Sequence, residues 1–449
     1  MGSESYGGRP SSLTLASDRR IVGRFMYLLY SFVLTVAALV SLPYFVYRGL
    51  VTGKYWPSLR QRLGFLPESI HSRGEPSIWV HAVSVGEVIT AKSLLPLLRE
   101  SFPAMPVFIS VTTLTGKQVA DRQLRDADGV FFCPFDWRFA VGRVIRRLRP
   151  QVLLVVETEI WPNMLRACHD AGAATMLVNG RISDRSFHRY RLIRGFLKHY
   201  LRPVDSFCMQ NSRYAERIIE LGADPSKVSV TGSLKFDAVV PRHGAPSPAA
   251  RLIPPGRAVL VAGSTLAPEE EILLDVFRAL RGKHEDLFLI LAPRHPERFD
   301  EVEKVAAARG LTVVRRSTLQ QPVSNADVMI LDTMGELASI YAAADVVFMG
   351  GSLATWGGHN IIEPAAEGKP VLFGPHMSNF QEIASSFLDA AAAIQVGDRD
   401  ELEESIARLL ADETLRADVG LRARQLVDAN RGAGRKTIES ARQAVGTAA

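Results

Sequence analysis

The 449-residue chain contains only three cysteines, Cys133, Cys168 and Cys208, which lie far apart in the sequence. An odd number of widely spaced cysteines does not build a disulfide framework, so we predict reduced core residues of a cytoplasmic protein. The sequence also lacks any zinc-ligand spacing and any nucleic-acid-binding motif, and its net charge is only +6. Such a charge favours anionic partners, and we expect no nucleic acid among them.

Metal-binding patterns are equally scarce. Two short acidic strings, Asp126–Asp128 and Asp398–Asp400, lie at the edges of predicted helices and far from the other candidate site residues. Acidic residues at helix edges are typical of solvated turns, and we interpret neither string as a set of metal ligands. We therefore predict that no metal is bound.

Charge is absent from one long segment, Phe25–Tyr47, which has enough apolar residues to cross a bilayer. Basic residues flank it on both sides, so the positive-inside rule does not settle its orientation. A cleaved signal peptide would need a small-residue cleavage site, which is not evident. A buried core helix, or a helix lying in the membrane interface, would fit the same composition. We predict an N-terminal tail over residues 1–24 and a membrane-anchor helix over 25–47.

The rest of the chain alternates apolar runs with helical patterns, which predicts parallel, doubly wound α/β sheets. A chain of this length should form two domains. A stretch rich in Pro, Ala and Gly, residues 241–256, is typical of a linker and would join domains at 48–240 and 257–449. The predicted strands are Ser77–Val83, Val107–Val111, Val130–Cys133, Val152–Val156, Thr175–Val178, Ser206–Met209, Val228–Val230, Ala258–Ala262, Leu287–Leu291, Leu311–Val314, Val328–Leu331, Val346–Met349 and Val371–Phe373.

Ligands of such folds bind beyond the carboxyl ends of the strands, so functional residues are expected there. In the first domain, Glu87 opens a helix behind the first strand, Glu157 directly follows a buried strand, and Lys235 follows the last strand. Glu87 could instead complement its own helix dipole, and Lys235 could be an ordinary surface lysine. A carboxylate directly after a buried strand, such as Glu157, needs a partner.

In the second domain, the segment GGHN before IIEPAAEG combines close backbone approach at its glycines with Asn360, a predicted helix N-cap. Glu363 would then lie in the first helical turn, where a carboxylate can bind a ribose diol. It could equally complement the helix dipole. Arg294, held between Pro293 and His295, suits a positioned phosphate ligand. The two domains thus predict an acid–base site and an anion site.

Several of these motifs occur together, and in this order they resemble one known family. HAVSVGE, ETEIWPN, TGSLKFD, APRHPERF, DTMGEL and the GGSL…GGHN…E segment with FGPH…NF resemble 3-deoxy-D-manno-octulosonic acid (Kdo) transferases of the lipopolysaccharide pathway. The resemblance runs from the hydrophobic helix to about Phe380. It implies a GT-B fold of two facing Rossmann-like domains, with the acceptor bound by the first and CMP-Kdo by the second. It also implies a lipid A precursor as acceptor, location on the cytoplasmic side of the inner membrane, and no cofactor or metal.

The resemblance also implies roles for individual residues. Glu87 corresponds to the family's general base, and Glu157 and Lys235 correspond to residues linked to the transition state. The implied CMP contacts are Pro293, Arg294, Met334, Gly335, Glu336, Asn360, Ile361, Ile362 and Glu363. The family commonly has proline-leucine-glutamate after GGHN, whereas this chain has two isoleucines before Glu363. We expect an inverting glycosyltransferase; the competing hypotheses are a UDP-sugar transferase or epimerase, and a non-catalytic membrane scaffold.

Overall fold

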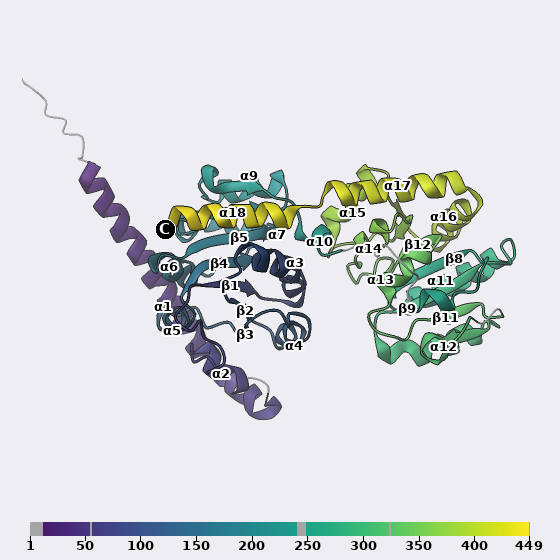
Figure 1. The fold of residues 1–449 in the computed structure, drawn as a ribbon, viewed down its shortest axis with the longest axis horizontal. Helices are drawn as coiled ribbons and strands as arrows, with labels where there is room; N and C mark the ends of the chain where they lie inside the picture. Colours follow the sequence, from purple (N-terminus) through teal and green to yellow (C-terminus); the bar gives the residue numbers. More distant parts are fainter. Residues whose placement is uncertain (1–11, 54–55, 240–247, 323–324, 449) are drawn as a thin grey trace, which may run out of the picture. The chain divides into compact units, whose positions relative to one another are not determined.

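The computed structural model describes residues 12–53, 56–239, 248–322 and 325–448. These residues fold into two compact units, which Figure 1 shows in sequence colours. The first comprises Met1–Ala238 with Gly432–Ala449, and the second comprises Val239–Arg431. Residues 1–11 of the predicted tail and residues 241–247 of the predicted linker lie outside the described residues.

The first unit is built on a seven-stranded parallel sheet in the order β3-β2-β1-β4-β5-β6-β7. Its strands are β1 (Ser77–Ala82), β2 (Val107–Val111), β3 (Gly129–Phe132), β4 (Pro150–Val156), β5 (Ala174–Gly180), β6 (Ser206–Met209) and β7 (Val228–Val230). The predicted strands of this domain are confirmed. β1 lies between β2 and β4, and Val80 pairs with Ile109 and Leu154. The segments that follow β1 and β4 are therefore neighbours at the carboxyl edge.

Helices cover both faces of this sheet because its strands are buried on both sides. Val80 and Ala82 belong to the core on one face, while Trp79 belongs to the core on the other. The helices are α2 (Trp56–Arg62), α3 (Val85–Ser101), α4 (Leu114–Gln123), α5 (Arg138–Leu148), α6 (Pro162–Asp170), α7 (Asp184–Leu192), α8 (Arg194–Leu201), α9 (Ser212–Glu220) and α10 (Leu234–Asp237), with the 3₁₀ turn Pro225–Lys227.

The last helix, α18 (Ala433–Ala448), packs on the first unit, although the sequence pattern assigned residues 257–449 to one domain. That assignment is wrong for the C-terminal segment. Ile438 and Ala441 are buried in the same core cluster as Val80, and Figure 1 shows α18 lying along β5. The Asp237 carboxylate accepts the N–H groups of Gly432 (2.7 Å) and Gly434 (2.6 Å), which fixes the start of the helix.

The second unit contains another seven-stranded parallel sheet, in the order β10-β11-β9-β8-β12-β13-β14. Its strands are β8 (Val259–Thr265), β9 (Phe288–Pro293), β10 (Val313–Arg315), β11 (Val328–Ile330), β12 (Val346–Met349), β13 (Val371–Phe373) and β14 (Ile394–Gln395). Its helices are α11 (Glu269–Arg281), α12 (Phe299–Ala307), α13 (Leu337–Ile340), α14 (Ile362–Ala366), α15 (Gln381–Asp389), α16 (Arg399–Ala411) and α17 (Glu413–Ala429), with 3₁₀ turns at Ala250–Leu252, Pro296–Arg298, Arg316–Thr318 and Tyr341–Ala343. The two-residue strand β14 was not predicted.

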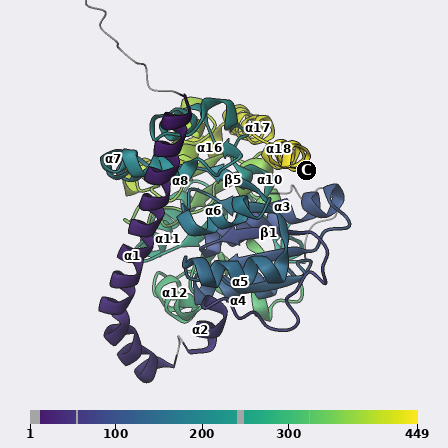
Figure 2. The ribbon, with the colours of Figure 1, turned by 90° about the vertical axis from the view of Figure 1, so that its left-hand side faces the viewer.

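The N-terminal helix α1 (Ser12–Thr52) runs unbroken along one side of the first unit (Figure 2). Its segment Phe25–Val51 is long and apolar enough to cross a membrane, and only 6% of its most apolar window is buried. The hypothesis of a buried core helix is therefore wrong. Tyr27 donates its hydroxyl to the His199 carbonyl (3.2 Å), and Tyr200 donates to the Met26 carbonyl (3.1 Å). The helix is thus apolar on its exposed side and hydrogen-bonded to the unit through α8.

Removal of the residues before Arg48 should release the protein from membranes without abolishing CMP binding, because the second unit carries the predicted CMP contacts. Loss of the contacts of Tyr27 and Met26 should also lower the melting temperature of the first unit. Sedimentation with membranes, CMP titration and thermal melting check these outcomes. Undiminished membrane sedimentation of the truncated protein would contradict the anchor.

Candidate functional site

Glu87 lies in the first turn of α3, directly behind β1, and its side chain turns back onto the strand end. Its carboxylate accepts the backbone N–H of Val83 (2.7 Å) and the hydroxyl of Ser84 (2.9 Å). Ser84 is the helix N-cap and in turn accepts the N–H of Glu87 at 3.4 Å. This reciprocal arrangement is a form of capping box, and it holds the carboxylate in one orientation. Only 6% of the residue is exposed.

The environment of Glu87 makes its carboxylate unusually basic. The pKa of Glu87 is raised to about 7, chiefly by burial and also by the charges of Glu157 and Glu159, while the hydrogen bonds from Val83 and Ser84 oppose this shift. A carboxyl group with a pKa near the working pH is suited to general base catalysis, because both of its protonation states are populated. Helix capping and proton transfer are therefore compatible roles of the same side chain.

The residues behind β4 complete a group of three carboxylates, Glu87, Glu157 and Glu159, which we call the acidic rim. Glu157 has a φ of +61°, a left-handed conformation that side chains other than glycine seldom adopt, and its N–H donates to the Val178 carbonyl at 2.8 Å. Burial and the charge of Glu157 raise the pKa of Glu159. Strained backbone of this kind is concentrated at functional sites. Glu159 was not among the predicted catalytic residues.

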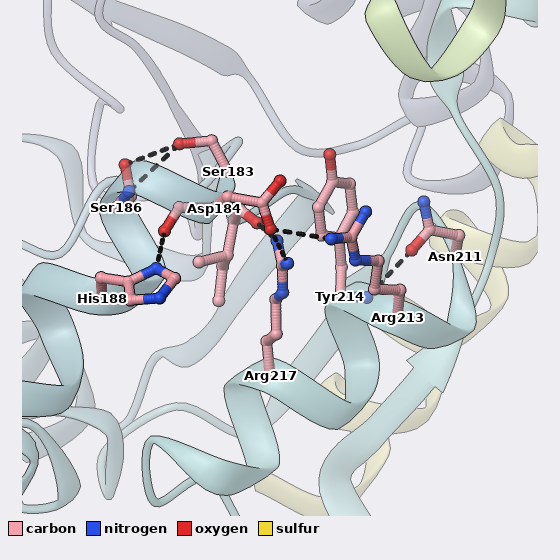
Figure 3. Close-up of polar contacts among 9 residues, drawn as sticks. Ser183, Asp184, Ser186, His188, Asn211, Arg213, Tyr214 and Arg217 are labelled. Carbon is pink, nitrogen blue, oxygen red and sulfur yellow. Dashed lines mark hydrogen bonds and ion pairs between the residues drawn. The ribbon is translucent and has the colours of Figure 1, made fainter. Parts of the chain in front are cut away.

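The loop behind β5 holds the acidic rim in place. Thr158, between the two rim glutamates, donates its hydroxyl to the Arg181 carbonyl (2.5 Å) and accepts the Arg181 N–H (2.9 Å). Figure 3 shows how this loop is fastened to the next helices. Asp184, at the start of α7, pairs with Arg217 and with Arg213 (2.7 Å), both from α9. Hydrogen bonds and ion pairs therefore connect the segments that follow β4 and β5 with each other and with α9.

Lys235 lies in the single turn of α10 behind β7 and is partly exposed. Fully buried Asn179, with a φ of +55°, accepts the N–H of Leu234 at 3.0 Å and so fixes this turn to the end of β5. α10 packs against α3, the helix whose first turn carries Glu87. The structure therefore places Lys235 and the acidic rim on connected elements.

In the second unit, a fully buried carboxylate orders the loop behind β12. Glu269 accepts four backbone N–H groups, those of Leu266 (3.1 Å), Gly351 (2.6 Å), Ser352 (2.8 Å) and Leu353 (2.9 Å). This loop leads into the GGHN segment, so Glu269 supports the predicted CMP contacts without belonging to them. Three consecutive glutamates stand at 269–271, of which Glu269 and Glu270 are both buried, and no local pattern indicates which one accepts these N–H groups.

Arg294, His295 and His359 form a second group, which we call the basic cluster. Arg294 and His295 follow β9 and are exposed, and the Arg294 N–H donates to the Thr265 carbonyl at 2.9 Å. Burial lowers the pKa of His359 to about 4, and the positive charges of Arg294 and His295 contribute to this shift. His359 is therefore neutral at pH 7. The cluster as a whole favours an anionic ligand.

Glu363 and Asn360 lie in the segment of the chain that follows β12. Asn360 donates to the Glu363 carboxylate (3.1 Å) and accepts the N–H of Ile362 (3.1 Å). The prediction that Asn360 is the helix N-cap is wrong by one position, since Ile361 occupies it and α14 has only five residues. Helix ends vary by a residue when a polar side chain bonds just outside the first turn. The side chains of Ile361 and Ile362 are fully buried, so these residues can offer a ligand only backbone groups.

The remaining predicted CMP contacts follow β9 and β11. Pro293 is the last residue of β9, Met334 is 70% exposed, and Gly335 adopts a φ of +86°. Glu336 accepts from Thr333 and pairs with Arg316 at 2.8 Å. Since β11, β9, β8 and β12 stand next to one another in this order in a parallel sheet, the segments at their carboxyl ends, and with them all predicted contacts, lie at one edge of that sheet. Within the described ranges, no cluster of three or more His, Cys, Asp or Glu side chains could hold a metal ion.

The two-unit fold is similar to those of solved nucleotide-sugar enzymes. A UDP-N-acetylglucosamine 2-epimerase matches with a TM-score of 0.55 and 15% identity, over 83% of this chain and 94% of that one. A glycosyltransferase from Rickettsia africae matches with a TM-score of 0.54 and 15% identity, over 83% and 99%. Residues 253–426 match the family model for glycosyl transferases group 1. The protein is therefore a glycosyltransferase with two parallel-sheet α/β units.

Its sequence narrows this class to one family. Residues 57–238 match the family model for 3-deoxy-D-manno-octulosonic-acid transferase. The chain is 32% identical over 390 residues to the 3-deoxy-D-manno-octulosonic acid transferase of Haemophilus influenzae, covering 86% of this chain and 91% of the relative. It is 34% identical over 372 residues to that of Bordetella pertussis, covering 81% and 86%. The chain belongs to the Kdo transferase family.

Glu269→Ala should destabilise the second unit by at least about 3 kcal/mol, because hydrogen bonds to a charged group contribute about 1.5–3 kcal/mol each and four buried N–H groups would lose their acceptor. Urea unfolding measures this loss. Glu271→Ala is the matched control, since Glu271 lies on the same helix with a 61% exposed side chain. Equal stability of the two variants would refute the role of Glu269.

Proposed function

We propose that this Kdo transferase moves Kdo from CMP-Kdo to a lipid A precursor by an inverting mechanism with Glu87 as the general base. The observation that supports this most directly is the buried Glu87 carboxylate, whose pKa is raised to about 7 at the carboxyl end of β1. Membership of the Kdo transferase family indicates that the transferred sugar is Kdo. The acidic rim contains a carboxylate that can activate an acceptor hydroxyl.

In the proposed reaction, Glu87 removes the proton of an acceptor hydroxyl while that oxygen attacks the anomeric carbon of Kdo. The bond from this carbon to the phosphate of CMP breaks, and CMP leaves with the bonding electrons. A single displacement inverts the configuration. General base catalysis accelerates such a step roughly 10²–10⁴-fold. Protonation of Glu87 also relieves its repulsion from Glu157 and Glu159, which favours proton uptake at that position.

The second unit is proposed to bind the donor nucleotide. Arg294, in the basic cluster, would pair with the phosphate, and Glu363, oriented by Asn360, would accept hydrogen bonds from the ribose. Arg294 and Lys235 would stabilise the negative charge that develops on the leaving group. Pro293, Met334, Gly335, Glu336 and the backbone of Ile361 and Ile362 complete the proposed contacts. No metal is required in this scheme.

We further propose that α1 holds the enzyme at the inner membrane, with both units on the cytoplasmic side. Its uncharged run is long enough to cross or to enter a bilayer, and its apolar side chains are largely exposed. A lipid acceptor is confined to the membrane, so an enzyme bound to the same surface meets it at high local concentration. Mass analysis of the product from CMP-Kdo and a tetra-acylated lipid A precursor tests the reaction as a whole.

Glu87→Gln should lower turnover by roughly two to four powers of ten at saturating donor and acceptor, because glutamine keeps the size of the side chain but cannot take a proton. In the wild type, activity should fall on the acid side with an apparent pKa near 7, since only the deprotonated carboxylate acts. The residual activity of the Glu87→Gln variant should not show this fall on the acid side of its pH profile.

Turnover separates this outcome from a merely structural role. Because the pKa of Glu87 is raised in the fold, ionisation costs stability as pH rises toward 7, so Glu87→Gln should be at least as stable as the wild type at pH 7 in either case. If Glu87 only completes the capping box, the variant should keep its turnover. Near-normal turnover of Glu87→Gln would contradict the assignment of Glu87 as general base, and Glu157 would be the next candidate.

Glu363→Ala and Arg294→Ala should each weaken CMP binding, Glu363→Ala by about 1.5–3 kcal/mol through the loss of hydrogen bonds to a charged group. Loss of Arg294 should also reduce the salt dependence of binding. Calorimetric titration with CMP and with UDP measures both effects and the base preference. Arg422→Ala is the control, because Arg422 is an arginine of α17 outside the predicted contacts, with a 43% exposed side chain. Unchanged CMP affinity in both test variants would show that the nucleotide binds elsewhere.

A further inference from the structure

An apolar groove separates α1 from the segment behind β3 in the first unit. Its volume is about 690 Å³, which is within the range of pockets that hold small ligands, roughly 300–1,000 Å³. One wall consists of α1 side chains whose spacing in the sequence places them on one face of the helix. The other wall consists of aromatic side chains. The residues that matter are Thr35, Ala38, Leu39 and Leu42 on α1, with Trp137 and Phe139 opposite.

The aromatic wall is held firmly in place. The rings of Trp137 and Phe139 are stacked, with centroids 5.7 Å apart and an interplanar angle of 15°. The indole N–H of Trp137 donates to the Thr35 hydroxyl at 3.2 Å, and the Arg143 guanidinium lies over the Phe139 ring at 5.3 Å. The indole N–H is thus bonded across to α1, and apolar surface is left to face the groove.

The groove is joined to the proposed catalytic edge. Its aromatic wall follows β3, at the same carboxyl edge of the sheet as the acidic rim. Between the two, the buried Asp136 carboxylate accepts the N–H groups of Asn163 (2.9 Å) and Met164 (2.7 Å), in the helix that follows the rim segment of β4. Arg138 adds a positive charge to the lining of the groove.

We propose that this groove binds one acyl chain of the lipid acceptor while the sugar end of that lipid extends along the carboxyl edge toward Glu87. The proposal rests on the proposed function. Leu39 and Leu42, 62% and 52% exposed, belong both to the groove and to the apolar surface of α1. An acyl chain can therefore enter from the bilayer without crossing water, whereas a polar ligand would have to leave water for an apolar lining.

Ala38→Trp in the full-length protein tests the proposal, because the indole would fill the groove. We expect the KM for a tetra-acylated acceptor to rise about tenfold or more, since each methylene withdrawn from an apolar site costs about fourfold in affinity. The kcat should change little. With the fully deacylated sugar acceptor, neither constant should change. Ala37→Trp is the matched control, because Ala37 is the adjacent, exposed alanine of α1 outside the groove lining.

An unchanged KM of Ala38→Trp for the acylated acceptor would overturn the proposal. If that result accompanies weaker sedimentation with phosphatidylglycerol vesicles, the groove holds bulk phospholipid instead. Wild-type protein that transfers Kdo to neither acceptor would refute the proposed function, a result distinct from both. Thermal melting verifies folding. If Ala38→Trp does not fold, Leu39→Asn replaces it, with Val40→Asn as its control at a 76% exposed position, and the same KM difference is expected.

Discussion

Buried carboxylates that accept backbone N–H groups hold the loops at the carboxyl edges of both sheets, and the site depends on them. Glu269 is bonded to four N–H groups and serves only to order its loop, while Asp136 holds the segment behind β3 against α6. Glu87 is held by one backbone N–H and one hydroxyl, and burial, together with the charges of Glu157 and Glu159, raises its pKa to about 7. Burial raises the pKa of Asp136 to about 7 as well, so the two carboxylates differ in their neighbours and not in their pKa: two further acids accompany Glu87, whereas two backbone N–H groups of α6 bind Asp136.

Hydrogen bonds join α1 to the first unit near this edge of its sheet. Tyr27 bonds to α8, Ser31 accepts from Asn163 at 3.1 Å, and Thr35 accepts from Trp137. These contacts occur within the apolar run itself, so if α1 enters a bilayer as proposed, its depth there also sets the height of the sheet edge above it. A loosely tethered catalytic unit would not be constrained in this way.

Local patterns predicted the strands and the strand-end residues, because hydrophobic alternation and glycine turns are properties of neighbouring residues. What the sequence did not reveal depends on partners far along the chain. Glu269 meets Gly351 across 82 positions, and Asp237 meets Gly432 across 195. The sequence of an alanine-rich helix such as α18 contains no local pattern that indicates which of the two sheets it packs against. The start of α14 lies one residue beyond Asn360 because the Asn360 side chain accepts the N–H of Ile362 from one position outside the N-cap.

The division of charge between the two sheets is a chemical requirement of the proposed reaction. A guanidinium within about 4–6 Å of a carboxylate lowers its pKa by about 1–3 units. If the basic cluster shared an edge with the acidic rim, Glu87 would lose the basicity that burial and its acidic neighbours provide, and Arg294 would be neutralised before a phosphate arrived. The acids follow β1 and β4 of one sheet and the basic cluster belongs to the unit built on the other, so neither group meets its counterpart within its own unit. Within each unit, the opposite charge is then left for the substrate to supply.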